Sequence, residues 1–149
     1  MNRKKSRVFL LDTDAAVRRC LARLIEVEPG LTVCGQASGM AEALERIPAA
    51  GPDAVVVSLD ALEGGGVSVV NHLRWEHPGL PLVAVSMREE TVFGRRLLQA
   101  GAAGYVTKSE AARRTVPAIR RVLRGGIYAG RAAGGTMRGK HDLKPGGRS

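Results

Sequence analysis

The chain has 149 residues, 23 Lys and Arg against 14 Asp and Glu, a formal net charge of +9 and 3% aromatic residues. This length predicts one domain with a sizeable core. No apolar run approaches the roughly 18 residues of a membrane helix, and no charged-then-apolar leader opens the chain, so the sequence argues against a membrane partner and for a cytoplasmic protein.

The excess positive charge lies mainly at the two ends of the chain. Residues 8–130 carry 14 Lys or Arg against 13 Asp or Glu, so the folded part is nearly neutral. We expect a basic N-terminal tail over 1–6, one domain over 7–128, and a disordered, basic, Gly-rich tail over 129–149. Basic tails of this kind can contact nucleic acid non-specifically and in a salt-dependent way. The nearly neutral domain argues against a surface that recognises nucleic acid specifically.

Apolar runs with strand character alternate with segments of helical period along the whole domain. The expected strands are 7–11, 31–37, 54–58, 81–86 and 104–107, and the expected helices are 15–27, 39–47, 66–76, 90–100 and 115–124. The third run is apolar without alternation, which is typical of a strand covered on both faces. The order predicts an α/β fold in which a five-stranded parallel sheet lies between two helical layers.

Polar residues precede three of these helices and are expected to cap them: Asp14, Ser38 and Thr115. A metal-ligand role is the alternative for Asp14. If Thr115 caps the last helix, Pro117 falls in its first turn, where proline is tolerated. The two cysteines, Cys20 and Cys34, share no metal-ligand spacing with the three histidines, so we expect both to be reduced core residues.

In an open parallel sheet the functional site lies at the carboxyl ends of the strands. Five polar residues fall at predicted strand ends: Asp12, Thr13, Ser58, Ser86 and Lys108. Four short motifs accompany them: Gly35-Gln36-Ala37, His77-Pro78-Gly79-Leu80-Pro81, Ala100-Gly101-Ala102-Ala103-Gly104-Tyr105 and Arg124-Gly125-Gly126. Together they resemble the receiver domains of two-component response regulators, in particular the receivers that precede LuxR-like helix-turn-helix domains.

The resemblance covers about residues 7–128 and implies a (βα)5 flavodoxin-like fold. It also implies roles for single positions: Asp12 matches the first of two acids after strand one, Ser86 the hydroxyl residue, Tyr105 the switch aromatic and Lys108 the lysine. Two positions depart from the family pattern. Thr13 stands where the second acid is expected, and Ser58 stands at the position of the phosphoacceptor aspartate.

These departures predict a degenerate site without catalytic residues. A serine cannot form an acyl phosphate, and its hydroxyl is a weak nucleophile without a base. Asp12 is then the one matched acid facing Lys108, and we expect an ion pair between them. Magnesium binding should be weak or absent, with Asp12 a weak candidate ligand, and we expect no other cofactor. Asp60, two residues past Ser58, is either a displaced acceptor or a solvated loop carboxylate.

We therefore expect a non-enzymatic, phosphorylation-independent signalling or interaction module in a phosphorelay or transcriptional-control pathway. Its partner would be another protein or a second copy, bound on the surface from the fourth helix to the last. The switch and interaction residues would be Ser86, Tyr105, Arg95, Arg96, Arg113, Arg120 and Arg121. The alternatives are a DNA-binding regulator, truncated or acting through its tails, and a conventional receiver phosphorylated at Asp60. The 23 residues after Gly126 are too few for an output domain, so we expect a stand-alone receiver or one separated from its output domain.

Overall fold

The computed structural model describes residues 4–60, 62, 65–89 and 91–129. Its centre is one parallel sheet with the strand order β2-β1-β3-β4-β5. The strands are β1 (Ser6–Leu11), β2 (Leu31–Ala37), β3 (Ala54–Ser58), β4 (Leu82–Ser86) and β5 (Gly104–Thr107). The alternation of strands and helices predicted from the sequence is confirmed, and the strand order is that of the flavodoxin-like fold.

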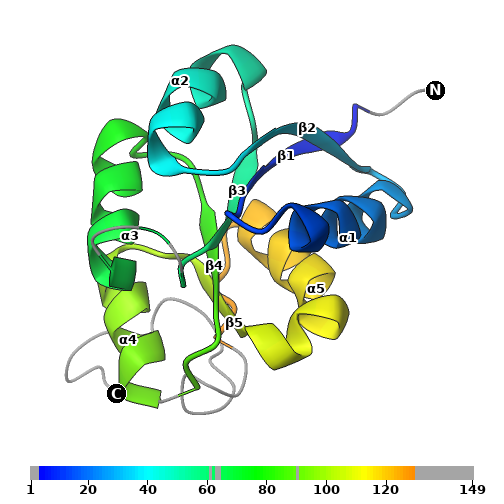
Figure 1. Cartoon of the computed structure of the whole chain (residues 1–149). Helices are drawn as coiled ribbons and strands as arrows, with labels where there is room; N and C mark the ends of the chain where they lie inside the picture. Colours follow the sequence, from blue (N-terminus) through cyan, green and yellow to red (C-terminus); the bar gives the residue numbers. More distant parts are fainter. Residues whose placement is uncertain (1–3, 61, 63–64, 90, 130–149) are drawn as a thin grey trace.

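In the described part of the chain, five helices cover the two faces of this sheet. They are α1 (Ala15–Glu26), α2 (Met40–Ala50), α3 (Gly65–Glu76), α4 (Thr91–Ala100) and α5 (Ala111–Leu123), with a short 3-10 turn (Lys108–Glu110) before α5. Helices α1 and α5 lie on one face and α2, α3 and α4 on the other (Figure 1). Among the described residues, no helix is both long enough and apolar enough to cross a bilayer.

Strand β3 shows why the sheet needs a helical layer on each face. All five of its residues are buried. Val55 and Val57 pack into the core beneath α2, α3 and α4, whereas Ala54 and Val56 pack into the core beneath α1 and α5. Because successive strand residues point to opposite faces, an unbroken apolar run places a hydrophobic side chain in both cores.

Helix α1 begins as the sequence predicts. The Asp14 carboxylate accepts hydrogen bonds from the backbone N–H groups of Ala16 at 2.9 Å and Val17 at 3.2 Å, so it is the N-cap. Helix α2 differs from its prediction, because Gly39 is the N-cap position and the Ser38 side chain donates instead to Glu42 at 3.1 Å. Hydrogen bonds from Ser38 lower the pKa of the Glu42 carboxyl.

Helix α5 begins at Ala111, four residues earlier than predicted. The 3-10 turn leads directly into it, so Thr115 is an interior helical residue, 1% exposed, rather than a cap. Pro117 therefore lies inside the helix and not in its first turn. The lost backbone hydrogen bond is offset by the buried face of the helix, where Ala118 and Ile119 are fully buried.

Of the two cysteines expected in the core, one lies outside it and the other packs against it. Cys20 is exposed on α1, whereas Cys34 in β2 is partly buried, and both thiols are free. Burial raises the pKa of the Cys34 thiol. Val27, the C-cap residue of α1, is 75% exposed.

The outer strands of the sheet are each covered by a neighbouring group. On β2, the N–H of Val33 donates to the Glu26 carboxylate at 2.7 Å, which lowers the pKa of that carboxyl. Beside β5, Tyr128 forms a parallel bridge with Gly104, and its carbonyl accepts the N–H of Tyr105 at 2.8 Å. The predicted tails fall largely outside the described residues, which begin at 4 and end at 129.

Candidate functional site

The polar residues predicted to share one edge of the sheet do so. Asp12 directly follows β1, Ser58 ends β3, Ser86 ends β4 and Lys108 directly follows β5. The ladder pairs Ser58 with Val85 in β4, and β4 in turn is in register with β5. The parallel register therefore brings the carboxyl ends of these strands level with one another.

Ser58 and Lys108 form the centre of the site. Ser58 is 5% exposed, and the Lys108 ammonium donates to its hydroxyl oxygen at 3.1 Å. The same ammonium lies 3.9 Å from the Asp60 carboxylate. The expected ion pair of Lys108 with Asp12 is replaced by this one, because the lysine side chain extends toward the loop after β3.

Asp60 is bound to the end of β4 as well as to Lys108. Its Oδ1 accepts the Ser86 hydroxyl at 2.8 Å, and its two oxygens accept the backbone N–H of Met87 at 3.2 and 3.0 Å. Neither role considered for Asp60 from the sequence, a displaced acceptor or a solvated loop carboxylate, included these contacts. The carboxylate accepts hydrogen bonds from one hydroxyl and one amide, and one ammonium lies at ion-pair distance, while the side chain stays 27% exposed.

A chain of contacts continues from Ser86 into the core. The backbone N–H of Arg88 donates to the Ser86 hydroxyl oxygen at 3.1 Å, and the Tyr105 hydroxyl donates to the Arg88 carbonyl. Tyr105 is fully buried, and its ring meets Phe93 edge to face at 6.0 Å. We expected Tyr105 on an interaction surface, but its side chain points into the core. The buried ring and the hydrogen bond of its hydroxyl both hold it there.

Asp12 is buried and carries an unpaired oxygen. It is 3% exposed, and its Oδ1 accepts the N–H of Asp14 at 2.9 Å. Its Oδ2 has no hydrogen-bond partner among the described residues. Thr13, the next residue along the chain, is exposed. Within the described ranges, no three His, Cys, Asp or Glu residues gather closely enough to hold a metal ion.

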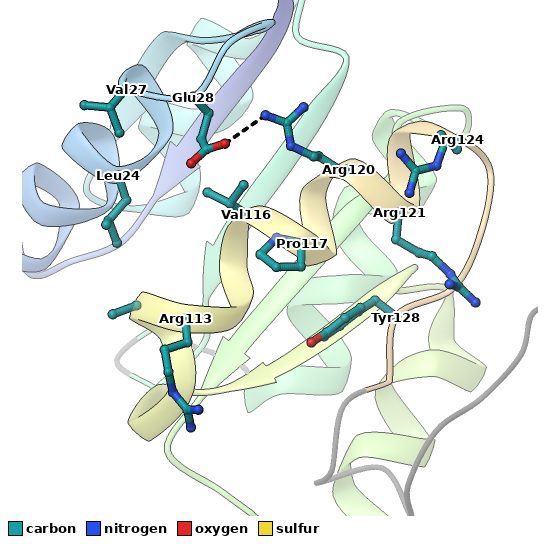
Figure 2. A pocket seen from close by; sticks show the side chains of 11 residues that line it. Leu24, Val27, Glu28, Arg113, Val116, Pro117, Arg120, Arg121, Arg124 and Tyr128 are labelled. Carbon is teal, nitrogen blue, oxygen red and sulfur yellow. Dashed lines mark hydrogen bonds and ion pairs between the residues drawn. The ribbon is translucent and has the colours of Figure 1, made fainter.

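The arginines predicted for an interaction surface divide between two places. Arg95 and Arg96 are exposed on α4. Arg113, Arg120 and Arg121 border a hollow of about 650 Å³ between α1 and α5 (Figure 2). Arg120 reaches across this hollow to Glu28 at 2.9 Å.

Sequence reasoning missed the backbone N–H of Met87 and the carbonyl of Arg88. A pattern of side chains carries no direct sign of which main-chain groups a site uses. The one available signal was the position of Asp60, which follows a strand end by two residues and lies beside the next strand of the sheet.

Comparisons with known proteins match most of the chain. A family model described as the response regulator receiver domain matches residues 8–120. The response regulator GacA of Pseudomonas viridiflava is 38% identical over 122 residues, which cover 82% of this chain and 57% of that protein. The DNA-binding transcriptional activator DevR/DosR of Mycobacterium tuberculosis is 38% identical over 103 residues, 68% of this chain and 47% of that protein.

The solved structures give the same result. A two-component response regulator of the LuxR family from Aurantimonas sp. SI85-9A1 superposes with a TM-score of 0.80 at 31% identity, covering 87% of this chain and 93% of that one. The chain spans about half the length of the curated relatives it matches, 57% of GacA and 47% of DevR/DosR.

Proposed function

This chain belongs to the response regulator receiver domain family, and we propose that within two-component signalling it acts as an interaction module without being phosphorylated. The observation that carries the proposal is the environment of Ser58. It ends β3 at the position that the family resemblance gives to the phosphoacceptor, and its hydroxyl oxygen accepts from the Lys108 ammonium.

The chemistry of this serine supports the proposal. A carboxylate attacks phosphorus directly, whereas a hydroxyl needs a base to take its proton. The neighbouring ammonium is a donor and cannot accept that proton. Neither described histidine lies at the strand ends, because His72 is in the last turns of α3 and His77 follows that helix. The nucleophile of an acyl-phosphate mechanism is therefore missing, and no described histidine can serve as the base of a serine alternative.

The donor set fits magnesium poorly. Magnesium requires nearly octahedral coordination and is held in proteins mainly by carboxylate oxygens. Asp12 offers one unpaired oxygen, Thr13 supplies no carboxylate, and the oxygens of Asp60 already accept from Ser86 and Met87. We therefore propose that magnesium binds weakly or not at all.

Without a phosphoryl group, another source of energy must set the state of the domain. Moving a two-state equilibrium from 1:99 to 99:1 takes about 5.5 kcal/mol of differential binding. We propose that a protein partner or a second copy supplies it through the exposed arginines of α4 and α5. Sedimentation of the wild-type chain and of Arg95→Ala with Arg96→Ala distinguishes these two partners, because self-association weakens in the variant only if α4 forms the contact between copies.

The test of phosphorylation independence is incubation with a small-molecule phosphodonor and magnesium, followed by the mass of the intact protein. The wild-type chain is expected to gain no phosphoryl group. The matched positive control is the double variant Thr13→Asp, Ser58→Asp, which restores both acids of the family pattern and is expected to gain one. A phosphoryl gain by the wild-type chain would overturn the proposal, and its loss in Asp60→Asn would identify Asp60 as a displaced acceptor.

A further inference from the structure

We infer that Asp60 is the permanent occupant of an anion pocket formed by the Ser86 hydroxyl, the Met87 backbone N–H and the Lys108 ammonium. The inference rests on the proposed function and deepens it, because it states what takes the place of an external anion. It predicts that the pocket binds free phosphate only after the Asp60 carboxylate has been removed.

The pocket collects three different donors at the ends of two strands. The hydroxyl and the amide belong to the end of β4 and bind the carboxylate at 2.8 to 3.2 Å, and the ammonium after β5 lies 3.9 Å away. Ser86 is 1% exposed, so its hydroxyl has little access to water and needs an acceptor. A hydroxyl, a main-chain N–H and an ammonium are the groups that bind phosphate oxygens in proteins. The donor set is therefore general for oxyanions and is not specific to a carboxylate.

Two buried leucines hold Asp60 in this position. Leu59 and Leu62 are 3% and 8% exposed, and both belong to the core beneath α3 and α4. The N–H of Leu59 donates to the Val85 carbonyl at 2.9 Å, which continues the sheet one residue past β3. Asp60 lies between these anchors, so little conformational entropy is lost when its carboxylate enters the pocket. A free anion must compete with a tethered one whose effective concentration is in the millimolar range or higher.

The occupied pocket also determines the conformation of the segment after β4. Ser86 donates to Asp60 and accepts from the N–H of Arg88, whose carbonyl in turn accepts the Tyr105 hydroxyl. The Arg88 guanidinium lies 4.1 Å from the centre of the Phe93 ring. The carboxylate is thus connected to the buried aromatic pair through one short segment. With Asp60 in the pocket, the segment after β4 therefore already has the conformation that a bound anion would stabilise.

The experiment is a titration of ¹⁵N-labelled protein with inorganic phosphate, followed at the Met87 amide. Asp60→Ala removes the occupant. Glu89→Ala is the matched control, because it removes one negative charge at the same end of the sheet, where Glu89 accepts from Ser109 at 3.2 Å outside the pocket. Wild type and Glu89→Ala are expected to show no saturable shift of Met87 up to about 10 mM phosphate, the range in which the tethered carboxylate competes.

In Asp60→Ala the Met87 amide is expected to shift saturably with phosphate. Without phosphate its hydrogen exchange should be roughly ten- to hundredfold faster than in the wild type, because a hydrogen bond to a charged acceptor has been lost. If Asp60→Ala no longer unfolds cooperatively, Asp60→Ser, which also removes the carboxylate but keeps a small polar side chain in the loop, replaces it with the same expected directions.

Unchanged Met87 exchange in the Asp60 variant, or phosphate binding by the wild type equal to that of the variant, would overturn the inference. These readouts are independent of the covalent mass gain that tests phosphorylation. If the chain is not phosphorylated and the hydrogen exchange of the Met87 amide is unchanged by the loss of Asp60, only the inference is refuted and the proposed function stands. A wild-type chain that becomes phosphorylated refutes the proposed function, whatever the Met87 amide reports.

Discussion

The energetic coupling between Lys108 and Asp60 measures how strongly the lysine holds the Asp60 carboxylate in the anion pocket. Their charged atoms are 3.9 Å apart, and the side chains are 29% and 27% exposed. At an effective dielectric constant of 20, the Coulomb energy at this separation is about 4 kcal/mol. Desolvation and side-chain ordering cancel most of it, which leaves 0 to about 1 kcal/mol for exposed pairs. Because the Ser86 hydroxyl and the Met87 N–H already order Asp60, we expect a coupling at the upper end, about 1 kcal/mol.

The assay is a double-mutant cycle of urea unfolding with wild type, Lys108→Met, Asp60→Asn and the double variant. The bond from Lys108 to Ser58 is lost in both lysine variants and cancels in the cycle. The control cycle uses Arg46 and Glu42 on α2, which are closer at 2.7 Å but more exposed, at 54% and 34%. That pair should couple by about 0.3 to 0.5 kcal/mol. A Lys108 to Asp60 coupling no larger than the control would refute the reasoning, since distance alone would then explain both pairs.

Three further perturbations test the packing around the site. Gly66→Ala places a methyl group 2.8 Å from the Phe93 ring and should cost about 1 to 3 kcal/mol in urea unfolding, whereas Gly79→Ala meets nothing within 4 Å and should cost far less. Thr115→Val removes a buried hydroxyl with no hydrogen-bond partner among the described residues and should stabilise by about 1 kcal/mol, read as a higher Tm; a lower Tm would contradict this. Glu26 has a folded pKa below its ordinary value, so its contribution to stability is present above the unfolded pKa and is lost as pH falls through the folded pKa. Glu26→Gln should therefore be less stable than wild type near pH 6 and should approach it as acid protonates the carboxyl; a difference that persists unchanged in acid would contradict the assignment.

The fold could be predicted from the sequence because each strand and helix is indicated by a pattern within its own segment. The unbroken apolar run of β3 required cover on both faces, and the polar residue that ends each strand placed Ser58, Ser86 and Lys108 at one edge. The start of α5 was misplaced because Thr115 resembles a cap in sequence. Burial of that helix face against the sheet overrides this preference and carries the helix through Pro117.

The contacts of Asp60 depend on tertiary structure and could not be predicted in the same way. Its direction follows from the burial of Leu59 and Leu62 on either side, which no pattern in the loop itself indicates. The inward position of Tyr105 has the same origin, since its hydroxyl bonds to a main-chain carbonyl after β4. Residue types at strand ends located the site, but main-chain groups that the sequence does not reveal complete it.

The groups that cover the outer strands restrict how any partner can bind. An open strand edge is a template on which another chain can add a strand, and this leads both to recognition and to aggregation. Here Glu26 occupies the N–H of Val33 on β2, and Tyr128 pairs with the main chain beside β5. A partner that extends the sheet would have to displace a carboxylate at one edge or a paired segment at the other. Helix faces and loops are left as the surfaces on which association costs no existing hydrogen bond of the sheet.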